Sequence, residues 1–369
     1  MPAFSLGTMF CGTAEPLRAG GSGSSRGRAR FSGRGRTSRQ QAVVVRAEKV
    51  AVTGATGLVG RQLVKQLVAR GDEVRVLTRD TEAARSSLGS FNALSFYGKR
   101  DWQEGIAGSR AVINLAGEPI STRWSESVKQ EILDSRVNTT QYLSDLIRGI
   151  EQPADRPEVF VSGSAIGFYG TSLTETFTED SPSGGDFLAS VCQKWEAAAH
   201  SATSGNPASS SSAGDDGDDD GAKGPRVVCV RTGLVLSKEG GVLGKMLPLF
   251  NLFVGSPLGS GSQWMSWVHR DDLVSLLLAC ADDSRYAGAV NGTAPQPVTM
   301  RVFSETLALV LKRPMFMPPV PDLPLQVLLG EGAVLVLEGQ KVVPKKATDL
   351  GFTFQYPQIK QALEHASKF

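Results

Sequence analysis

Three glycines between residues 54 and 60 are spaced for chemistry with a phosphate group. They follow the apolar run Val50–Thr53 and precede apolar side chains at helical spacing. Gly54 permits a tight turn, Gly57 lets a pyrophosphate approach the backbone, and Gly60 lets a helix pack on a strand. Free N–H groups in the first helical turn would face the phosphates. The predicted dinucleotide contacts of this turn are Gly54, Thr56, Gly57, Leu58, Val59 and Gly60. A glycine turn without a ligand is the alternative.

The end of the next predicted strand, residues 72–79, indicates which dinucleotide is bound. This position is where the fold reads the adenosine ribose, and an NAD-binding protein places an acid there. Here the strand ends in Thr78-Arg79. A guanidinium suits the 2′-phosphate of NADP(H), which we therefore predict as the cofactor. The alternative is that Arg79 is only a solvated loop charge.

Strand and helix patterns alternate through most of the chain. Predicted strands at 111–117, 159–161 and 226–231 alternate with predicted helices at 125–148 and 187–200. This order predicts an α/β fold with a doubly wound, Rossmann-type parallel sheet. Ligands bind at the carboxyl edge of such sheets, so we expect Asn114, Leu115, Ala116 and Gly117 to contact the cofactor.

The first 47 residues differ from the rest in composition. They contain eight Arg, no Lys and one acid, Glu15, in a Ser- and Gly-rich background. This composition predicts an organellar transit peptide, and Val45-Arg46-Ala47 resembles a chloroplast cleavage site. Removing its net seven positive charges takes the formal charge from +2 to −5, which argues against a nucleic-acid partner. We expect a stromal protein.

Three further features bound the class of protein. Residues 201–223 consist almost wholly of Ser, Gly, Ala and Asp, so we predict a disordered surface insertion. Cys192, Cys229 and Cys280 lack the paired spacing of a zinc or disulfide framework, so no metal is expected. No apolar run reaches the roughly 18 residues of a transmembrane helix.

Several phrases together resemble a known family, the extended short-chain dehydrogenases/reductases. They are the glycine turn, RVN at 136–138, NLAGEPI at 114–120, RTGLVL at 231–236, PLGSG at 257–261, QWMSWVH at 263–269, NGTAP at 291–295 and GQKVVP at 339–344. The chain is most similar to the atypical, epimerase-like subfamily that includes the plastid giant-chloroplast (SulA-like) division proteins. The resemblance implies a cofactor domain at 48–312 and a small C-terminal domain of unknown function at 313–369. It also implies possible homodimers, and possible placement beside the inner envelope.

The resemblance also implies catalytic positions. Asn138 matches the family's Asn and Ser164 its Ser, whereas Leu188 and Cys192 stand where the family has the Tyr and Lys of Tyr-x-x-x-Lys. Tyr169 could offer a substitute phenol, and Cys192 a nucleophile if its pKa were lowered. The usual hydride-transfer mechanism is therefore not expected.

Other residues are expected on the substrate side. Trp267 and His269 resemble positions that line the substrate in relatives, although a buried structural histidine is an equal alternative for His269. Arg123 could receive an anionic substrate, and Asp271 or Asp272 is expected to cap the helix that follows. Two functions remain open: an NADP(H)-dependent oxidoreductase or epimerase of unknown substrate, and a non-catalytic NADP(H)-binding protein read by plastid partners.

Overall fold

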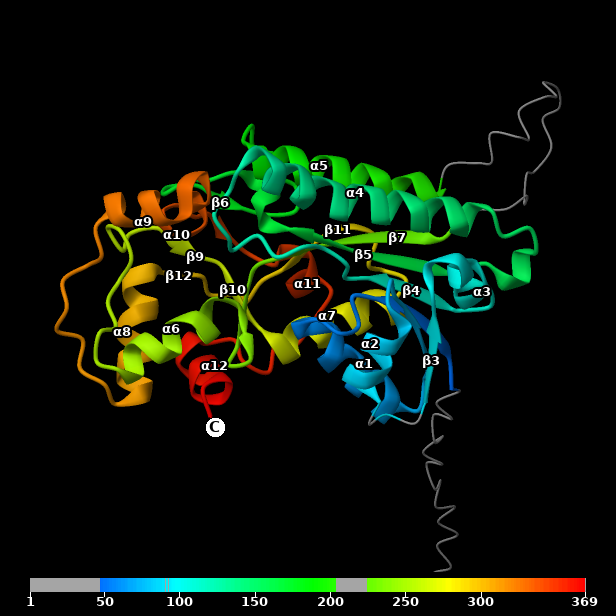
Figure 1. Cartoon of the computed structure of the whole chain (residues 1–369), viewed down its shortest axis with the longest axis horizontal. Coiled ribbons are helices and arrows are strands. Elements are labelled where there is room, and N and C mark those ends of the chain that lie inside the picture. The colour runs from blue at the N-terminus through cyan, green and yellow to red at the C-terminus, as the bar shows by residue number, and fades with distance from the viewer. Residues whose placement is uncertain (1–46, 90, 92, 204–223, 369) are drawn as a thin grey trace, which may run out of the picture. The chain divides into compact units, whose positions relative to one another are not determined.

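Seven parallel strands form the central sheet of the protein, in the order β11-β7-β5-β4-β1-β2-β3 (Figure 1). The computed structural model describes residues 47–89, 91, 93–203 and 224–368. The strands are β1 Lys49–Thr53, β2 Glu73–Leu77, β3 Leu94–Tyr97, β4 Ala111–Asn114, β5 Val159–Ala165, β7 Arg226–Thr232 and β11 Gly288–Gly292. The predicted doubly wound α/β sheet is confirmed.

Helices cover both faces of this sheet, so its strands are apolar on both sides. Val50 and Val52 pack toward α1 and α7, whereas Ala51 and Phe160 pack toward the face that carries α3, α4 and α5. Figure 1 shows α4 and α5 above the sheet, with α1, α2 and α7 below it. The helices are α1 Leu58–Arg70, α2 Thr81–Leu88, α3 Trp102–Ile106, α4 Glu126–Arg148, α5 Phe187–His200 and α7 Arg270–Asp282.

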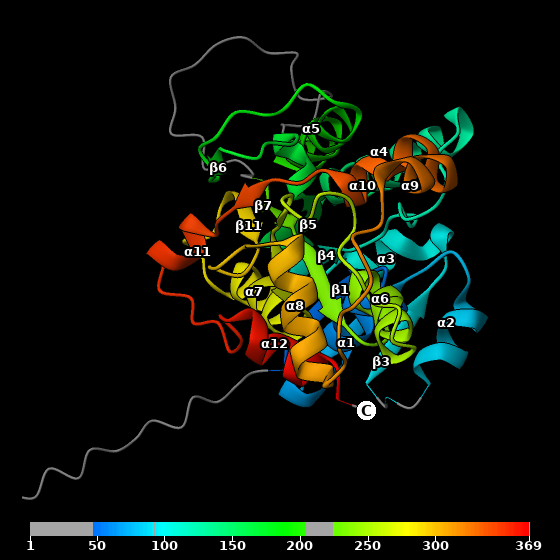
Figure 2. The same ribbon diagram turned by 90° about the vertical axis from the view of Figure 1, so that its left-hand side faces the viewer.

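The remaining elements gather beside the carboxyl edge of the sheet, except α11, which packs against β11. They are β6 Thr176–Phe177, β8 Leu234–Ser237, α6 Gly241–Asn251, β9 Trp264–Met265, β10 Trp267–His269, β12 Val298–Thr299, α8 Met300–Leu311, α9 Asp322–Leu329, α10 Val334–Leu337, β13 Lys341–Val342, α11 Lys345–Asp349 and α12 Ile359–Ala366. Figure 2 shows α6, α8 and α12 on the side that faces the viewer, and the side chains of these helices share one apolar cluster with those of β8 and β10. Segments before and after residue 313 therefore pack in a common core.

The sheet order places a crevice beside β1. The chain runs outward from β1 through β2 to β3, and then returns to β4 on the other side of β1. The loops after β1 and β4 consequently diverge, which is where open α/β sheets bind ligands.

Two of the segments predicted from composition fall mostly outside the described residues. These are the transit peptide, described only at residue 47, and the acidic insertion, described only at 201–203 as a short 3-10 helix. Among the helices that the structure describes, none has both the length and the apolarity to cross a bilayer.

Candidate cofactor and substrate site

A cleft of about 330 Å³ lies at the carboxyl ends of β1, β2 and β4; we call it the cofactor cleft. Eight of the predicted site residues line it: Gly54, Thr56, Gly57, Arg79, Leu115, Ala116, Gly117 and Asn138. Leu58, Val59 and Gly60 belong to the adjoining first turn of α1 and do not line the cleft themselves.

The glycine turn brings two loops of the sheet into close backbone contact. Gly54 has φ of +66°, and a Cβ there would lie 2.6 Å from the carbonyl carbon of Leu115. A Cβ on Gly60 would lie 2.1 Å from the oxygen of Gly54. Gly57 precedes α1 and gives it no side-chain cap, so the first N–H groups of that helix stay open to an anion. The turn therefore fits a pyrophosphate.

Asn114 positions the second loop of the cleft from below. Its side chain is fully buried, accepts from Thr53 Oγ1 at 2.6 Å and donates to Thr140 Oγ1 at 2.8 Å. Its Oδ1 also accepts from the Ala116 N–H at 3.2 Å. Asn114 thus does not line the cleft; it holds the backbone of residues 115–117 against the cleft.

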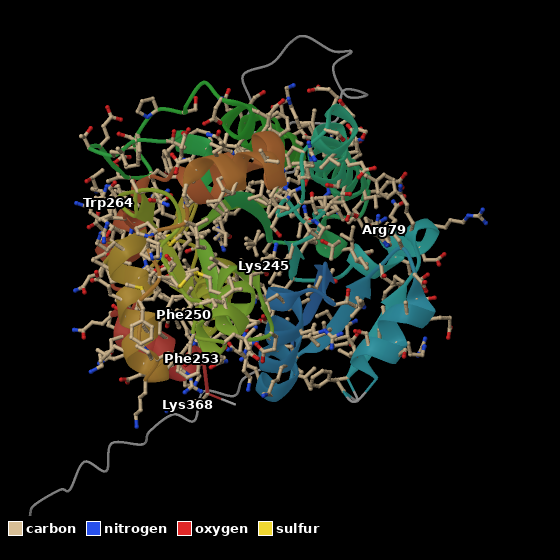
Figure 3. The ribbon with its side chains drawn as sticks, turned by 60° about the vertical axis from the view of Figure 1, so that its left-hand side comes forward. Arg79, Lys245, Phe250, Phe253, Trp264 and Lys368 are labelled. Carbon is tan, nitrogen blue, oxygen red and sulfur yellow. The ribbon has the colours of Figure 1, made fainter. Side chains whose placement is uncertain are left out.

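Two cationic side chains line the ribose end of the cofactor cleft. The Arg79 side chain, labelled in Figure 3, is 82% exposed and pairs with Glu118 at 3.2 Å. Lys99, which follows β3, is the second, and sequence patterns did not single it out. The cations of Arg79 and Lys99 outnumber the one acid at this end of the cleft, Glu118, which is already paired with Arg79. The resulting net positive charge favours a phosphate.

A second cavity of about 440 Å³ shares the loop 115–124 and helix α4 with the cofactor cleft; we call it the apolar cavity. Its other walls come from α5, the loop after β5, β9 and the segment 331–340. Ser164, Leu188 and Cys192 line it together with the indoles of Trp124, Trp195 and Trp264. The tertiary structure therefore joins residues more than a hundred positions apart in one mostly apolar chamber.

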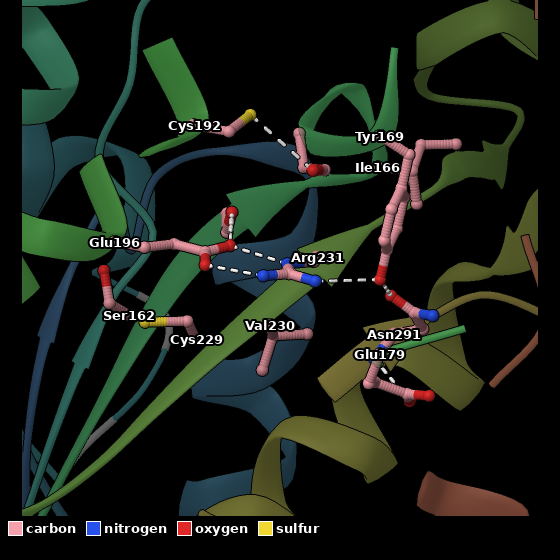
Figure 4. Close-up of polar contacts among 12 residues, drawn as sticks. Ser162, Ile166, Tyr169, Glu179, Cys192, Glu196, Cys229, Val230, Arg231 and Asn291 are labelled. Atoms are coloured by element: carbon pink, nitrogen blue, oxygen red, sulfur yellow. Dashed lines mark hydrogen bonds and ion pairs between the residues drawn. The ribbon is translucent and has the colours of Figure 1, made fainter. Parts of the chain in front are cut away.

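A buried polar network runs from Glu196 through Arg231 and Tyr169 to Asn291 (Figure 4), and Ser164 is bonded to its Glu196 end. Its hydroxyl donates to Glu196 Oε1 at 2.6 Å, and Arg231 pairs with both Glu196 oxygens at 2.8 and 2.9 Å. Arg231 also donates to Tyr169 Oη at 2.9 Å, and that phenol donates to Asn291 Oδ1 at 2.6 Å. Each partner thus fixes the orientation of the next.

Tyr169 lines neither cavity. Its phenol is 3% exposed, and burial raises its pKa to about 12 despite the neighbouring Arg231 cation. It also stacks on Phe177 with ring centroids 5.3 Å apart. The geometry gives Tyr169 a structural place in the network, and Asn138, Ser164 and Tyr169 do not meet at one point.

Cys192 faces the apolar cavity without the surroundings of a nucleophile. Its thiol donates to the Ala165 oxygen at 3.6 Å, and burial raises its pKa to about 12. Cys229 and Cys280 are buried, as expected of small core residues.

The expected substrate-lining residues lie elsewhere. Arg123 is exposed and lines neither cavity. Trp267 is fully buried, and its indole donates to the Gln296 oxygen at 3.0 Å. His269 is 2% exposed and caps α7 by accepting from the Asp271 N–H at 3.1 Å. The expectation that Asp271 or Asp272 caps α7 is therefore wrong: Asp272 instead accepts from the N–H groups of Gln355 and Tyr356.

A histidine pair ties α12 to the start of α7. His269 Nδ1 accepts from the backbone, so its neutral ring carries the proton on Nε2, 3.1 Å from His365 Nδ1. Together with Asp271 these rings bring ligand-type atoms within 4.8 Å of one another. A metal would need the lone pair of His269 Nε2, but that nitrogen carries the proton. The arrangement therefore fits a hydrogen bond from His269 to His365 rather than a metal site.

Acidification is expected to weaken this pair. Burial lowers the pKa of His269 to about 4, below the usual value of about 6.5; Asp271 opposes this shift, and the His365 and Arg270 charges add smaller lowering effects. The unfolded chain therefore binds the proton more readily, and stability is lost as pH falls from about 6.5 to 4. Urea unfolding at pH 7.5 and pH 5 should show this loss, and His269→Asn, which retains a cap, should reduce it. The exposed His200→Gln should leave it unchanged; an equal loss in His269→Asn would assign it to another group.

Arg136 is the functional candidate that sequence reasoning left without a role. It lines the apolar cavity, and its guanidinium packs against Gly117 of the cofactor cleft, where a Cβ would lie 3.3 Å from Cζ. It donates to the oxygens of Ile132 and Glu118 at 3.0 and 2.9 Å. The RVN phrase at 136–138 singled out Arg136 in the sequence, but nothing in that phrase predicted that the side chain would lie between the two cavities.

The fold and cleft define a dinucleotide-binding protein of the Rossmann class. Residues 50–291 match the NAD dependent epimerase/dehydratase family, and residues 320–366 match a domain of unknown function. The chain belongs to the NAD dependent epimerase/dehydratase family.

Individual relatives cover most of the chain. It is 46% identical over 317 residues, 85% of each chain, to "Epimerase family protein SDR39U1 homolog, chloroplastic" of Arabidopsis thaliana. It is 35% identical to "Epimerase family protein YfhF" of Bacillus subtilis, over 85% of this chain and 96% of that one. The structure of human SDR39U1 with NADPH is 33% identical, with a TM-score of 0.71 over 86% of this chain and 99% of that one. The predicted cofactor agrees with the dinucleotide in that structure.

Proposed function

We propose that this chain is an NADP(H)-dependent oxidoreductase of atypical mechanism. The observation that carries the proposal is the junction of a phosphate-fitting cofactor cleft and an apolar cavity across one wall, at Arg136. The turn at Gly54–Gly57 and the open start of α1 would hold the pyrophosphate, and Arg79 with Lys99 would hold the 2′-phosphate. When bound, NADPH supplies a hydride.

This chain's own residues would place a substrate against that cofactor. The indoles and Leu188 would exclude water from the apolar cavity, while Ser164 would border the substrate and Arg136 would orient its polar group. The family resemblance puts Leu188 and Cys192 where a phenol and an ammonium would stand, so the proton must reach the product by another route. Catalysis in this proposal rests on positioning and charge.

A second candidate function is that of a non-catalytic NADP(H)-binding protein whose redox or ligand state is recognised by plastid partner proteins. The same pair, Leu188 and Cys192, favours it, because the cofactor residues are present without the usual acid and base. A chloroplast location is part of both proposals, supported by the Arg-rich first 47 residues and by the chloroplastic Arabidopsis relative. A role in plastid division, a stromal or envelope-side position, and a homodimer rest on the family resemblance.

Arg79→Glu should remove the preference for NADPH over NADH, so that the protein binds both with similar affinity. It replaces a charge-assisted contact worth about 1.5–3 kcal/mol, so affinity for NADPH should fall roughly 10- to 100-fold while affinity for NADH stays similar. A fluorescence titration with each dinucleotide measures both constants. The same charge reversal at Lys65, exposed on α1 and outside the cleft, is the control. Unchanged NADPH affinity in Arg79→Glu would leave Arg79 as a solvated charge.

Turnover separates the two candidate functions. NADPH oxidation across a panel of carbonyl compounds, lowered by Ser164→Ala, would support the oxidoreductase. Stoichiometric NADPH binding with no turnover on any member of the panel would support the regulatory protein.

A further inference from the structure

The hydrogen-bond donors around the apolar cavity are already engaged. Each hydroxyl that lines it donates to a protein acceptor, as follows: Ser164 to Glu196, Thr171 to Glu338, Thr232 to the Val230 oxygen and Ser266 to the Gln340 oxygen. Each lining indole donates as well: Trp124 to Ile120, Trp195 to Thr140 and Trp264 to Leu173. A ligand therefore meets aromatic rings and acceptor lone pairs, with few side-chain donors left unbonded.

These donors are also turned away from a bound ligand. The Ser164 hydroxyl points into a carboxylate that is held by Arg231, and the Cys192 thiol donates to the Ala165 oxygen at 3.6 Å. Reduction of an aliphatic ketone gives an alkoxide, which is about as basic as hydroxide and needs a proton at once. Among the described residues of the cavity no side chain is placed to supply it.

Arg136 supplies charge instead of a proton. Within the described parts of the chain its guanidinium forms no ion pair, because the carboxylate of Glu118 is directed to Arg79. Arg136 donates only to uncharged acceptors, namely the backbone oxygens of Ile132 and Glu118 and the Ser135 hydroxyl. The guanidinium lies 5.4 Å from the ring centre of Trp195. Burial lowers the pKa of this guanidinium, although Cys192 and Glu118 oppose the shift. A negative charge placed beside the buried, unpaired cation would therefore be stabilised. The remaining charged lining groups are engaged: Glu331 with Lys129, Glu338 with Thr171 and Asp186 as the cap of α5.

We propose that the apolar cavity binds a planar, conjugated two-electron acceptor of the quinone class, with one carbonyl oxygen directed at Arg136. This inference rests on the proposed oxidoreductase function and names its substrate class. The flat rings suit the three indoles, and the single cation suits the single oxygen that becomes negative.

The chemistry balances without an acid in the cavity. A quinone accepts one hydride, two electrons and one hydrogen nucleus, from NADPH and becomes a hydroquinone monoanion, leaving NADP⁺. The negative charge is delocalised as in a phenolate, whose conjugate acid has a pKa of about 10, so the anion persists beside Arg136. Solvent then supplies the second proton after the product leaves.

The test measures binding first, in the full chain without NADPH. Calorimetric titration with 2,3-dimethoxy-1,4-naphthoquinone, which has no free position for thiol addition, is compared with 2-naphthoate, cyclohexanone and UDP-glucose. We expect saturable binding of the quinone in preference to the other three. Arg136→Met should weaken it about tenfold or more, and Arg123→Met, an exposed arginine outside the cavity, should not.

The outcomes separate this inference from the function on which it rests. NADPH binding without quinone binding, preferential binding of 2-naphthoate or UDP-glucose, or equal quinone affinity in Arg136→Met would each overturn the inference. Quinone binding without NADPH binding would overturn the proposed oxidoreductase. Quinone-dependent NADPH oxidation whose rate falls in Arg136→Met would support both.

Discussion

Gly54→Ala is expected to abolish NADPH binding and to destabilise the protein. A Cβ at this position would lie 2.6 Å from both the carbonyl carbon and the oxygen of Leu115, and the residue has φ of +66°. The positive φ and the backbone overlap each cost about 1–3 kcal/mol, and relief of the overlap would separate the two loops that form the cleft. Thermal unfolding and a fluorescence titration with NADPH measure the two effects.

Gly71→Ala is the matched control for this substitution. Gly71 ends α1 with φ of +92°, and no heavy atom lies within 4 Å of the Cβ position. It therefore carries the conformational cost alone, and NADPH affinity should be unchanged. If Gly54→Ala were to resemble Gly71→Ala in both measurements, the approach of the β1 and β4 loops would have no bearing on the cofactor.

Glu196→Leu is expected to cost about 3–5 kcal/mol of unfolding free energy, because it leaves a buried guanidinium without its carboxylate. The side chains of Arg231 and Glu196 are only 6% and 10% exposed, and Arg231 has no other acid bonded to it in the described network. Ser164 would lose its acceptor at the same time. Urea unfolding gives the loss directly.

A double-mutant cycle tests the cause. The double variant Glu196→Leu/Arg231→Met removes both charges. Its loss of unfolding free energy should therefore be smaller than the sum of the losses in the two single variants. Lys345→Met, which breaks an exposed pair with Asp349 at 2.7 Å, should have a far smaller effect on stability, because solvent screens that pair. Additive losses in the cycle would mean that packing, rather than the ion pair, explains the Glu196 effect.

The local sequence was enough to predict the scaffold. Apolar runs with helical or strand periodicity, capped by turn residues, give the order of strands and helices, and α5 begins and ends at the predicted Phe187 and His200. The glycine turn could also be predicted from the local sequence, because its geometry depends on neighbours within a few residues. Arg79 could be placed at the cleft because the fold fixes the end of β2 relative to that turn.

The substrate side depended on contacts that are distant in sequence. Trp267 and His269 were expected to line the substrate, but β10 pairs with β8 and carries both into the core. Arg123 and Arg136 have the same charge and lie thirteen positions apart, but only Arg136 folds back against Gly117 and faces the apolar cavity. Lys99 joins Arg79 only because β3 pairs with β2.

The sequence by itself determined the Rossmann sheet and the site for a dinucleotide, because both follow from short-range periodicity and backbone freedom at glycine. Only the tertiary structure decided which polar side chains face the apolar cavity and which form hydrogen bonds with one another. Whether Ser164 is a free donor or is bonded to Glu196 depends on a residue 32 positions away. Burial and hydrogen bonding set that chemistry, and both are properties of the packed chain.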